Sequence, residues 1–298
     1  VDYFGCSSTS LGDLDGDGVG DIAVGASGND DTDAYAESGA VYILFLTSDG
    51  AVKSSQKISS MYGNFPTDLW TSLGASVTSI GDLDGDGIVD IACGATTSYQ
   101  TAGGQVYITF LATDGSVKSI QRISNMYANF PYELDWDDRF GSSVANLGDL
   151  DGDGTIDIMI GSRLDDDGGT DTGSAYILFL TTSGLVKSAQ KISNSYGGFP
   201  YTIDYQDVFG ISCSGLGDLD GDGVFDAVVG AYYDEHGSAG AIYILFLSTD
   251  GLVKAAQKIS GLYGGMPYEL DSSTVMDSSS NFGCGVANTD DLNGDGVQ

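Results

Sequence analysis

The sequence has few basic residues and no long apolar run. Lysine and arginine together number 10, against 43 aspartates and glutamates, so the net charge at pH 7 is −33. Nucleic acids and anionic membrane surfaces would repel this charge, and a cation is the natural partner. Apolar runs such as residues 242–247 are far shorter than the roughly 20 residues that a membrane-spanning helix needs. The composition therefore predicts a segment that neither inserts into a membrane nor binds nucleic acid.

Histidine and cysteine are equally scarce. His236 is the only histidine, which excludes a histidine-dependent site in every repeat, and no nucleophile elbow, HExxH or phosphate-binding motif occurs. The cysteines, Cys6, Cys93, Cys213 and Cys284, do not keep one repeat position, unlike a disulfide framework or a zinc site. They are interpreted as small buried apolar residues, with a bridge between neighbouring repeats left open. No catalytic residue is predicted.

Aspartate and glycine, by contrast, are abundant and recur in one short loop. GDLDGDG begins at Gly12, Gly81, Gly148 and Gly217, and DDLNGDG begins at Asp290, so one unit recurs about every seventy residues. Hydrophobic residues make up 41% of the chain and fall in regular runs, which excludes disorder despite the charge. With 45 glycines, 17 tyrosines and no amphipathic helix, the sequence predicts an all-β protein.

Each unit is predicted to form four strands. In the first unit, a short strand within 4–18 enters the acidic loop and 21–26 leaves it, followed by strands at 40–47 and 51–59. The third is apolar throughout, as expected of a strand covered on both faces, whereas the fourth carries charge like an edge strand. Four-stranded units of this kind predict a β-propeller. The main alternative, a stacked β-solenoid, has a shorter period.

The units resemble FG-GAP repeats, the blades of the integrin α-subunit propeller and its relatives. A Phe-Gly or Leu-Gly pair begins each unit, at Phe4, Leu73, Phe140, Phe209 and Phe282. A Gly-Ala or Gly-Ser pair follows each complete loop, at Gly25, Gly94, Gly161 and Gly230. The family's proline is replaced in a turn by Ser27, Thr96, Arg163 and Tyr232.

This resemblance covers almost the whole chain. It implies a single array over 1–298 with blades of four antiparallel strands, at about 1–60, 61–124, 125–193 and 194–260, and a partial fifth at 261–298. Family propellers usually close with seven blades, so a closed ring is expected to need a longer polypeptide. Both ends fall inside repeats, and any signal peptide or anchor is expected outside this segment.

The acidic loop has the spacing of a calcium site. Alternate residues of a tight loop project to one side, so Asp13, Asp15 and Asp17 converge while the glycines let the backbone curl. A carbonyl at Val19 and the Asp21 carboxylate would complete an all-oxygen shell, which favours Ca²⁺ over Mg²⁺. The equivalent predicted ligands are Asp82, Asp84, Asp86, Ile88 and Asp90; Asp149, Asp151, Asp153, Thr155 and Asp157; Asp218, Asp220, Asp222, Val224 and Asp226; and, in the incomplete fifth loop, Asp291, Asn293, Asp295 and Val297.

An EF-hand is excluded, because it requires a bidentate glutamate at the twelfth position and a helix on each side. The twelfth position here is Val24, Cys93, Ile160 or Val229, inside a predicted strand. Crowded carboxylates repel one another, so metal binding and folding are predicted to be coupled. The ions are interpreted as structural.

Eight of the ten basic residues occupy two positions of the fourth strands. They are Lys53 and Lys57, Lys118 and Arg122, Lys187 and Lys191, and Lys254 and Lys258. They are interpreted as edge-strand charges that discourage aggregation, or alternatively as a cationic rim that meets an acidic surface on another copy or on a polysaccharide. Tyrosines in the connectors, Tyr62, Tyr127, Tyr196 and Tyr263, are predicted to pack between blades.

The resemblance implies a non-enzymatic, extracellular or cell-surface scaffold that binds a protein or glycan partner in adhesion. Recognition is expected in the polar loops between second and third strands, on the face opposite the acidic loops. A structural subunit of a surface layer, sheath or filament is the first alternative. An accessory domain of a larger enzyme is the second.

Overall fold

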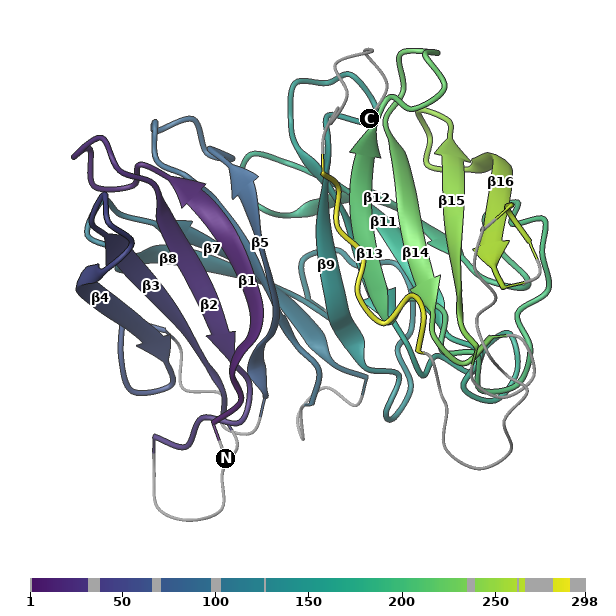
Figure 1. Cartoon of the computed structure of the whole chain (residues 1–298), viewed down its shortest axis with the longest axis horizontal. Helices are drawn as coiled ribbons and strands as arrows, with labels where there is room; N and C mark the ends of the chain where they lie inside the picture. Colours follow the sequence, from purple (N-terminus) through teal and green to yellow (C-terminus); the bar gives the residue numbers. More distant parts are fainter. Residues whose placement is uncertain are drawn as a thin grey trace. The chain divides into compact units, whose positions relative to one another are not determined.

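The computed structural model describes residues 2–31, 38–65, 71–97, 103–125, 127–234, 239–261, 263–265 and 281–289. These residues form four four-stranded antiparallel sheets and contain no α-helix (Figure 1). The predicted all-β fold is confirmed, and the sheets are consistent with four propeller blades. Among the described residues, no helix has the length and apolar character that crossing a membrane requires.

The sheets take their strands in chain order. Sheet 1 comprises β1 (Phe4–Gly12), β2 (Asp21–Ala26), β3 (Ala40–Leu46) and β4 (Val52–Ser59); sheet 2 comprises β5 (Leu73–Gly81), β6 (Asp90–Ala95), β7 (Gln105–Leu111) and β8 (Val117–Ile123). Sheet 3 comprises β9 (Phe140–Gly148), β10 (Asp157–Ser162), β11 (Ser174–Leu180) and β12 (Val186–Ile192); sheet 4 comprises β13 (Ser212–Gly217), β14 (Asp226–Ala231), β15 (Ala241–Leu247) and β16 (Val253–Ser260).

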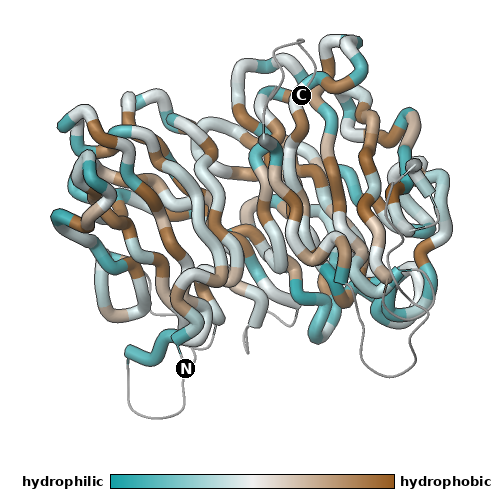
Figure 2. The backbone as a smooth tube through the Cα atoms, viewed as in Figure 1, coloured by the Kyte–Doolittle hydropathy of each residue, from teal (hydrophilic) through white to brown (hydrophobic). Residues whose placement is uncertain are grey.

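Burial across a sheet follows the apolar pattern of its strands. Every residue of β6, β7, β10, β11 and β14 is buried, as their near-continuous apolar sequence requires. The fourth strands are partly exposed, and the first four residues of β4 face solvent. Figure 2 shows hydrophobic residues concentrated along the strands and hydrophilic residues in the connecting loops. Each acidic loop therefore leads into a second strand that is buried or nearly so, although β1, which precedes the first loop, is mostly exposed.

A backbone bridge joins each sheet to the start of the next repeat. The glycine before each third strand pairs in parallel with the first residue of the following Phe-Gly or Leu-Gly motif. The pairs are Gly39 with Leu73, Gly104 with Phe140, Gly173 with Phe209, and Gly240 with Phe282. The recurrence of one bridge at every junction explains why the motif returns at a fixed period.

The Gly-Ala and Phe-Gly motifs are the two sides of one close backbone contact. A Cβ atom on Gly94 would lie 2.0 Å from the carbonyl oxygen of Gly141, whose φ is +91°. Ser76 Oγ donates a hydrogen bond to the same oxygen at 2.9 Å. The contact recurs between Gly25 and Gly74 and between Gly230 and Gly283, with Ser7 and Ser212 as donors. A side chain at either glycine position is therefore excluded by space or by backbone conformation.

The chain forms two compact units. The first comprises Val1–Val144 and Leu180–Lys187, and the second comprises Ala145–Phe179 and Ser188–Gln298. Each unit has its own core: Ile43, Ile91 and Tyr107 are fully or almost fully buried in the first, and Ile177, Phe209 and Tyr243 are fully buried in the second. The blade boundaries and the single array predicted from the sequence stay predictions.

Candidate functional site

Each acidic loop connects the first and second strands of its sheet and is held by hydrogen bonds from its own backbone. In the second loop, Asp82 Oδ1 accepts from the amides of Gly85 (2.8 Å) and Asp86 (2.9 Å), and Asp82 Oδ2 accepts from Gly87 (2.7 Å). Asp86 Oδ1 accepts from the amide of Ile88 at 2.9 Å. The first aspartate therefore shapes the turn, and it still has lone pairs to offer a ligand.

The other loops repeat this arrangement. The amide five residues after the first aspartate donates to it in each of the other three described loops: Gly18 to Asp13, Gly154 to Asp149, and Gly223 to Asp218, at 2.8–2.9 Å. The two loop glycines adopt left-handed φ values, +79° and +89° at Gly16 and Gly18. Because that conformation is costly for other residues, the D-G-D-G sequence is required by the turn itself.

Three carboxylates come together in each of the four described loops. One oxygen from each lies within 4.8 Å of the others. The groups are Asp13, Asp15 and Asp17; Asp82, Asp84 and Asp86; Asp149, Asp151 and Asp157; and Asp218, Asp220 and Asp226. An all-oxygen set of several carboxylates is the donor set that a hard divalent cation takes, so the residues fit calcium.

The last aspartate of each loop is the first residue of the second strand and is fully buried. Asp21 Oδ2 accepts from the amide of Leu14 and Oδ1 accepts from the amide of Leu46, both at 3.0 Å. Asp90 and Asp226 each accept from the two equivalent amides. These carboxylates tie the loop to the end of the third strand, a structural role that the sequence reasoning missed.

Burial perturbs two of these last aspartates. It raises the pKa of Asp90 to about 6, against the opposing effect of the hydrogen bonds from Leu111 and Leu83. Burial also raises the pKa of Asp226. A nearby cation favours the charged form of a buried carboxylate. A bound divalent ion would therefore lower the pKa of both aspartates, against the effect of burial.

A lysine of the fourth strand contacts the loop carboxylates in three sheets. Lys53 Nζ lies 2.8 Å from Asp15 Oδ2 and also contacts Asp17. Lys118 contacts Asp86 and lies 3.7 Å from Asp84, and Lys254 contacts Asp222. The hydrogen bond from Lys53 lowers the pKa of Asp17. The lysines are therefore partners of their own loops, which the sequence interpretation as edge charges or a free rim did not anticipate.

All the predicted metal ligands stay predictions, including the backbone carbonyls and the fifth loop. The amides of Val19, Ile88, Thr155 and Val224 donate to loop carboxylates. The fifth set, comprising Asp291, Asn293, Asp295 and Val297, lies outside the described residues. The twelfth loop positions lie in β2, β6, β10 and β14, and an EF-hand is excluded as predicted.

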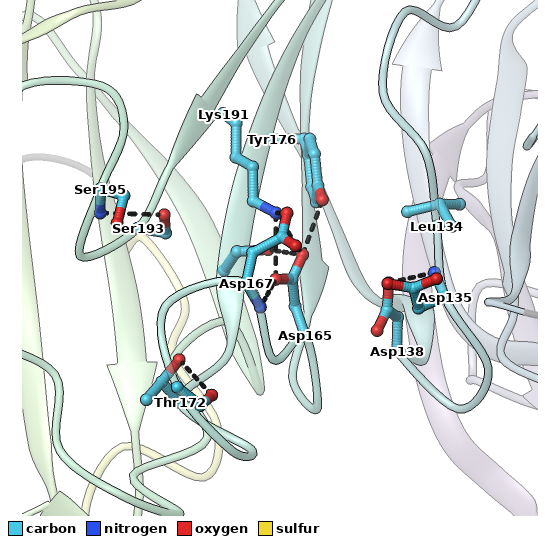
Figure 3. A network of polar contacts seen from close by, with 12 residues as sticks. Leu134, Asp135, Asp138, Asp165, Asp167, Thr172, Tyr176, Lys191, Ser193 and Ser195 are labelled. Carbon is cyan, nitrogen blue, oxygen red and sulfur yellow. Dashed lines mark hydrogen bonds and ion pairs between the residues drawn. The ribbon is translucent and has the colours of Figure 1, made fainter.

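The second basic position of the fourth strands forms a separate network at the other end of the sheet. Lys191 is 1% exposed and pairs with Asp165 and with Asp167 (Figure 3). Asp165 also accepts from Tyr176 Oη and from Ser174 Oγ, both at 2.7 Å. Lys258 pairs similarly with Asp234 at 3.0 Å. These lysines are thus internal counterions.

The connector tyrosines were predicted to pack between blades, but the structure shows them partly exposed to solvent. Their side chains are 43–54% exposed, and each ring lies against the cation of its own fourth strand. The closest of these contacts joins Arg122 to Tyr127, at 3.6 Å from the ring centroid. Cys93 and Cys213 are buried as interpreted, whereas Cys6 and Cys284 are exposed, and none of these four described cysteines forms a disulfide.

A groove of about 860 Å³ lies at the end of β10 and β14 that is remote from the acidic loops. Arg163 contributes the one basic side chain of its lining, with Asp171, Asp204 and Asp207 as acids. The rings of Tyr232 and Tyr233, with centroids 4.0 Å apart and planes tilted by 32°, contribute to the lining, as does Tyr205, which is 67% exposed. Exposed rings beside several carboxylates suit a cationic or polyhydroxylated group.

Comparison with known proteins is consistent with this geometry. The model of the FG-GAP repeat matches residues 7–44, 73–109 and 213–245. Integrin alpha-4 of Xenopus laevis is 32% identical over 173 residues, and integrin alpha-5 of the same species is 29% identical over 239 residues. These matches cover 56% and 77% of this chain but 15% and 20% of the relatives. Integrin alpha-PS2 of Drosophila melanogaster is 31% identical over 206 residues, 66% of this chain and 13% of the relative.

Proposed function

Since the chain is built of FG-GAP repeats and is distantly similar to integrin α subunits, we propose that it is an extracellular, calcium-binding propeller scaffold that binds a partner in adhesion. The acidic loops hold structural Ca²⁺, and the opposite ends of the sheets carry the recognition surface. The scaffold itself performs no catalysis. The chain spans only about a fifth or less of the length of these relatives, so the whole-protein role is part of the proposal.

The observation that carries the calcium proposal is the fourfold recurrence of converging carboxylates. In every described loop, three carboxylate oxygens lie within 4.8 Å of one another. The first, third and fifth loop positions would supply the carboxylates, with the buried last aspartate and one backbone carbonyl completing the shell. A bound ion would supply positive charge that holds these groups together. Repetition in every sheet is the behaviour of a structural ligand set, whereas an active site occurs once.

The groove at the ends of β10 and β14 supports the proposal of a partner-binding surface. Three carboxylates against one guanidinium make its lining acidic, and the exposed ring of Tyr205 adds a face for cation–π contact. A basic side chain of a protein partner fits this chemistry best. Arg163, Asp171, Tyr232 and Tyr233 come from the loops after β10 and β14, where recognition was expected, whereas Asp204, Tyr205 and Asp207 come from the connector between β12 and β13.

No observation favours the surface-layer alternative. It drew on the near-identical units and on a rim of lysines available to another copy, and six of these lysines pair with aspartates of their own repeat. No described residue specifically supports an accessory role beside a catalytic domain. The adhesion scaffold is therefore the function that the site supports best.

Calcium binding is tested by titrating the chelator-stripped full chain with Ca²⁺ and, separately, Mg²⁺, using calorimetry and thermal melts. We expect calcium affinities of roughly 10⁻⁴ to 10⁻³ M, as in other extracellular modules. At a concentration thirty times the Kd, each site stabilises the fold by about 2 kcal/mol. Asp84→Asn should remove one site, because a central carboxylate of the second loop is lost.

Asp114→Asn is the matched control, because Asp114 is also an aspartate of a tight turn in sheet 2, where it accepts from Ser116 and lies outside the acidic loop. An unchanged melting temperature in excess calcium would refute the calcium proposal.

The partner proposal is tested by probing a protein and glycan array with the calcium-loaded chain and its Tyr205→Ala variant. Trp136→Ala, a substitution of an exposed aromatic outside the groove, should leave binding intact.

A further inference from the structure

Three lysines outside the predicted ligand set reach into the acidic loops. Each is the second residue of a fourth strand, and each touches the carboxylate at the fifth loop position: Lys53 contacts Asp17, Lys118 contacts Asp86, and Lys254 contacts Asp222. The partners lie more than thirty residues apart in sequence. The same contact in three sheets argues for a built-in arrangement of the repeat. Lys187 holds the same sequence position in β12.

Strand pairing explains how the lysine reaches the loop. The last residue of the third strand donates its amide to the buried loop aspartate, as Leu46 does to Asp21 at 3.0 Å. Leu46 in turn pairs with Val52, beside Lys53, after a register shift that follows Phe45. The same shift occurs at the ends of β7 and β15. The irregularity brings the first part of the fourth strand close to the loop.

We propose that these lysines are internal counterions that set the calcium affinity of the loops. The lysine ammonium group forms an ion pair with the carboxylate at the fifth loop position. An entering cation has to displace the ammonium group before that carboxylate can become a ligand. The inference rests on the proposed calcium sites and adds a residue that regulates them. Without calcium, the lysine offsets part of the repulsion among the carboxylates, so the hairpin keeps its shape.

Geometry distinguishes this role from that of a solvated edge charge. The Lys53 side chain is 26% exposed, and its Nζ lies 2.8 Å from Asp15 while also contacting Asp17. The partner carboxylate is bound on its other oxygen as well, since Asp17 Oδ1 accepts from the amide of Val19 at 2.9 Å. One ammonium therefore neutralises a carboxylate that the loop already holds in place. A solvated lysine would not point at the same loop position in three sheets.

The same strands provide a matched control. Four residues after Lys254, Lys258 carries the same charge but pairs with Asp234 at 3.0 Å, away from the acidic loop. Lys258→Gln therefore removes one charge from β16 without removing a loop contact. A change of affinity caused by net charge alone would appear in both variants. A change caused by the counterion would appear only in Lys254→Gln.

The test compares wild type with Lys254→Gln, Lys258→Gln and Lys254→Arg by competition of the stripped chain with a chromophoric calcium chelator, and by melts in excess chelator. Removing a unit charge about 5 Å from a divalent ion should tighten one calcium site about tenfold. The melting temperature of the metal-free Lys254→Gln chain should fall. Lys254→Arg should retain wild-type affinity within about twofold because it keeps the charge.

Equal or weaker calcium binding by Lys254→Gln, in a chain whose wild type binds calcium, would overturn the counterion role and leave the proposed function standing. If Lys254→Gln does not fold, the triple variant K53R/K118R/K254R provides the test. It keeps every charge and should bind calcium like wild type. A triple variant that binds more tightly by tenfold would contradict the inference. A wild type that binds no calcium would overturn both proposals.

Discussion

At the scale of single residues, the motif glycines and the buried loop aspartates determine how each repeat is held together. The sequence identified both motif glycines but not the reason for their pairing, because that reason lies in the next sheet. Gly94 has an ordinary backbone conformation, and only the carbonyl of Gly141, 2.0 Å from a built Cβ, forbids a side chain there. No local pattern in the sequence reports such a contact, so it emerges only from the fold.

Gly94→Ala is predicted to destabilise the chain by about 3 kcal/mol, because a methyl group would force the two backbones apart in a close-packed junction. Gly20→Ala is the control, since the nearest atom to a Cβ there is 3.9 Å away. We expect the control to change stability by less than about 0.5 kcal/mol. Urea denaturation of both variants in excess chelator measures the difference, and equal losses would contradict the assigned contact.

At the scale of the element, the fourth strand shows what sequence patterns can and cannot reveal. Its charge and its place after the turn that follows the apolar third strand predicted its position, and the structure confirms it in all four described sheets. The two basic positions looked alike in the sequence, but they serve opposite ends of the sheet. Lys53 pairs with the acidic loop, whereas Lys57 pairs with Asp31. A lysine four residues from another shares its face, but only the positions of the loops decide its partner.

Lys191→Met is predicted to cost about 3–5 kcal/mol, because it leaves the buried carboxylate of Asp165 without its cation. Lys191 and Asp165 side chains are 1% and 2% exposed, so solvent screens the pair little. Adding Asp165→Asn should recover part of this loss, since the amide can still accept from Tyr176 without carrying charge. Chemical denaturation of the two variants provides the measurement. A double variant that is less stable than Lys191→Met would contradict the ion-pair explanation.

At the scale of the whole molecule, the net charge is −33, and the four complete acidic loops carry 16 of the 43 acidic residues. Alternation within a tight turn is a local property, and three carboxylates do lie together in each described loop, although the last aspartate takes the place of Asp153 and Asp222 in the third and fourth groups. The sequence did not predict that buried aspartates would tie the loops to the third strands, or that lysines would offset part of the charge. The fold therefore already lowers the repulsion that a cation is proposed to remove.

The remaining repulsion predicts how salt affects stability. Raising NaCl from about 0.02 M to about 0.2 M shortens the screening length to below 10 Å, which weakens the repulsion between neighbouring carboxylates. The metal-free chain should therefore melt at a higher temperature in the higher salt. In saturating calcium the increase should be smaller, because each bound ion would cancel two negative charges within the loops. Thermal melts at the two salt concentrations, with and without calcium, measure this difference. Equal salt effects in both states would show that the loops are not where the destabilising charge resides.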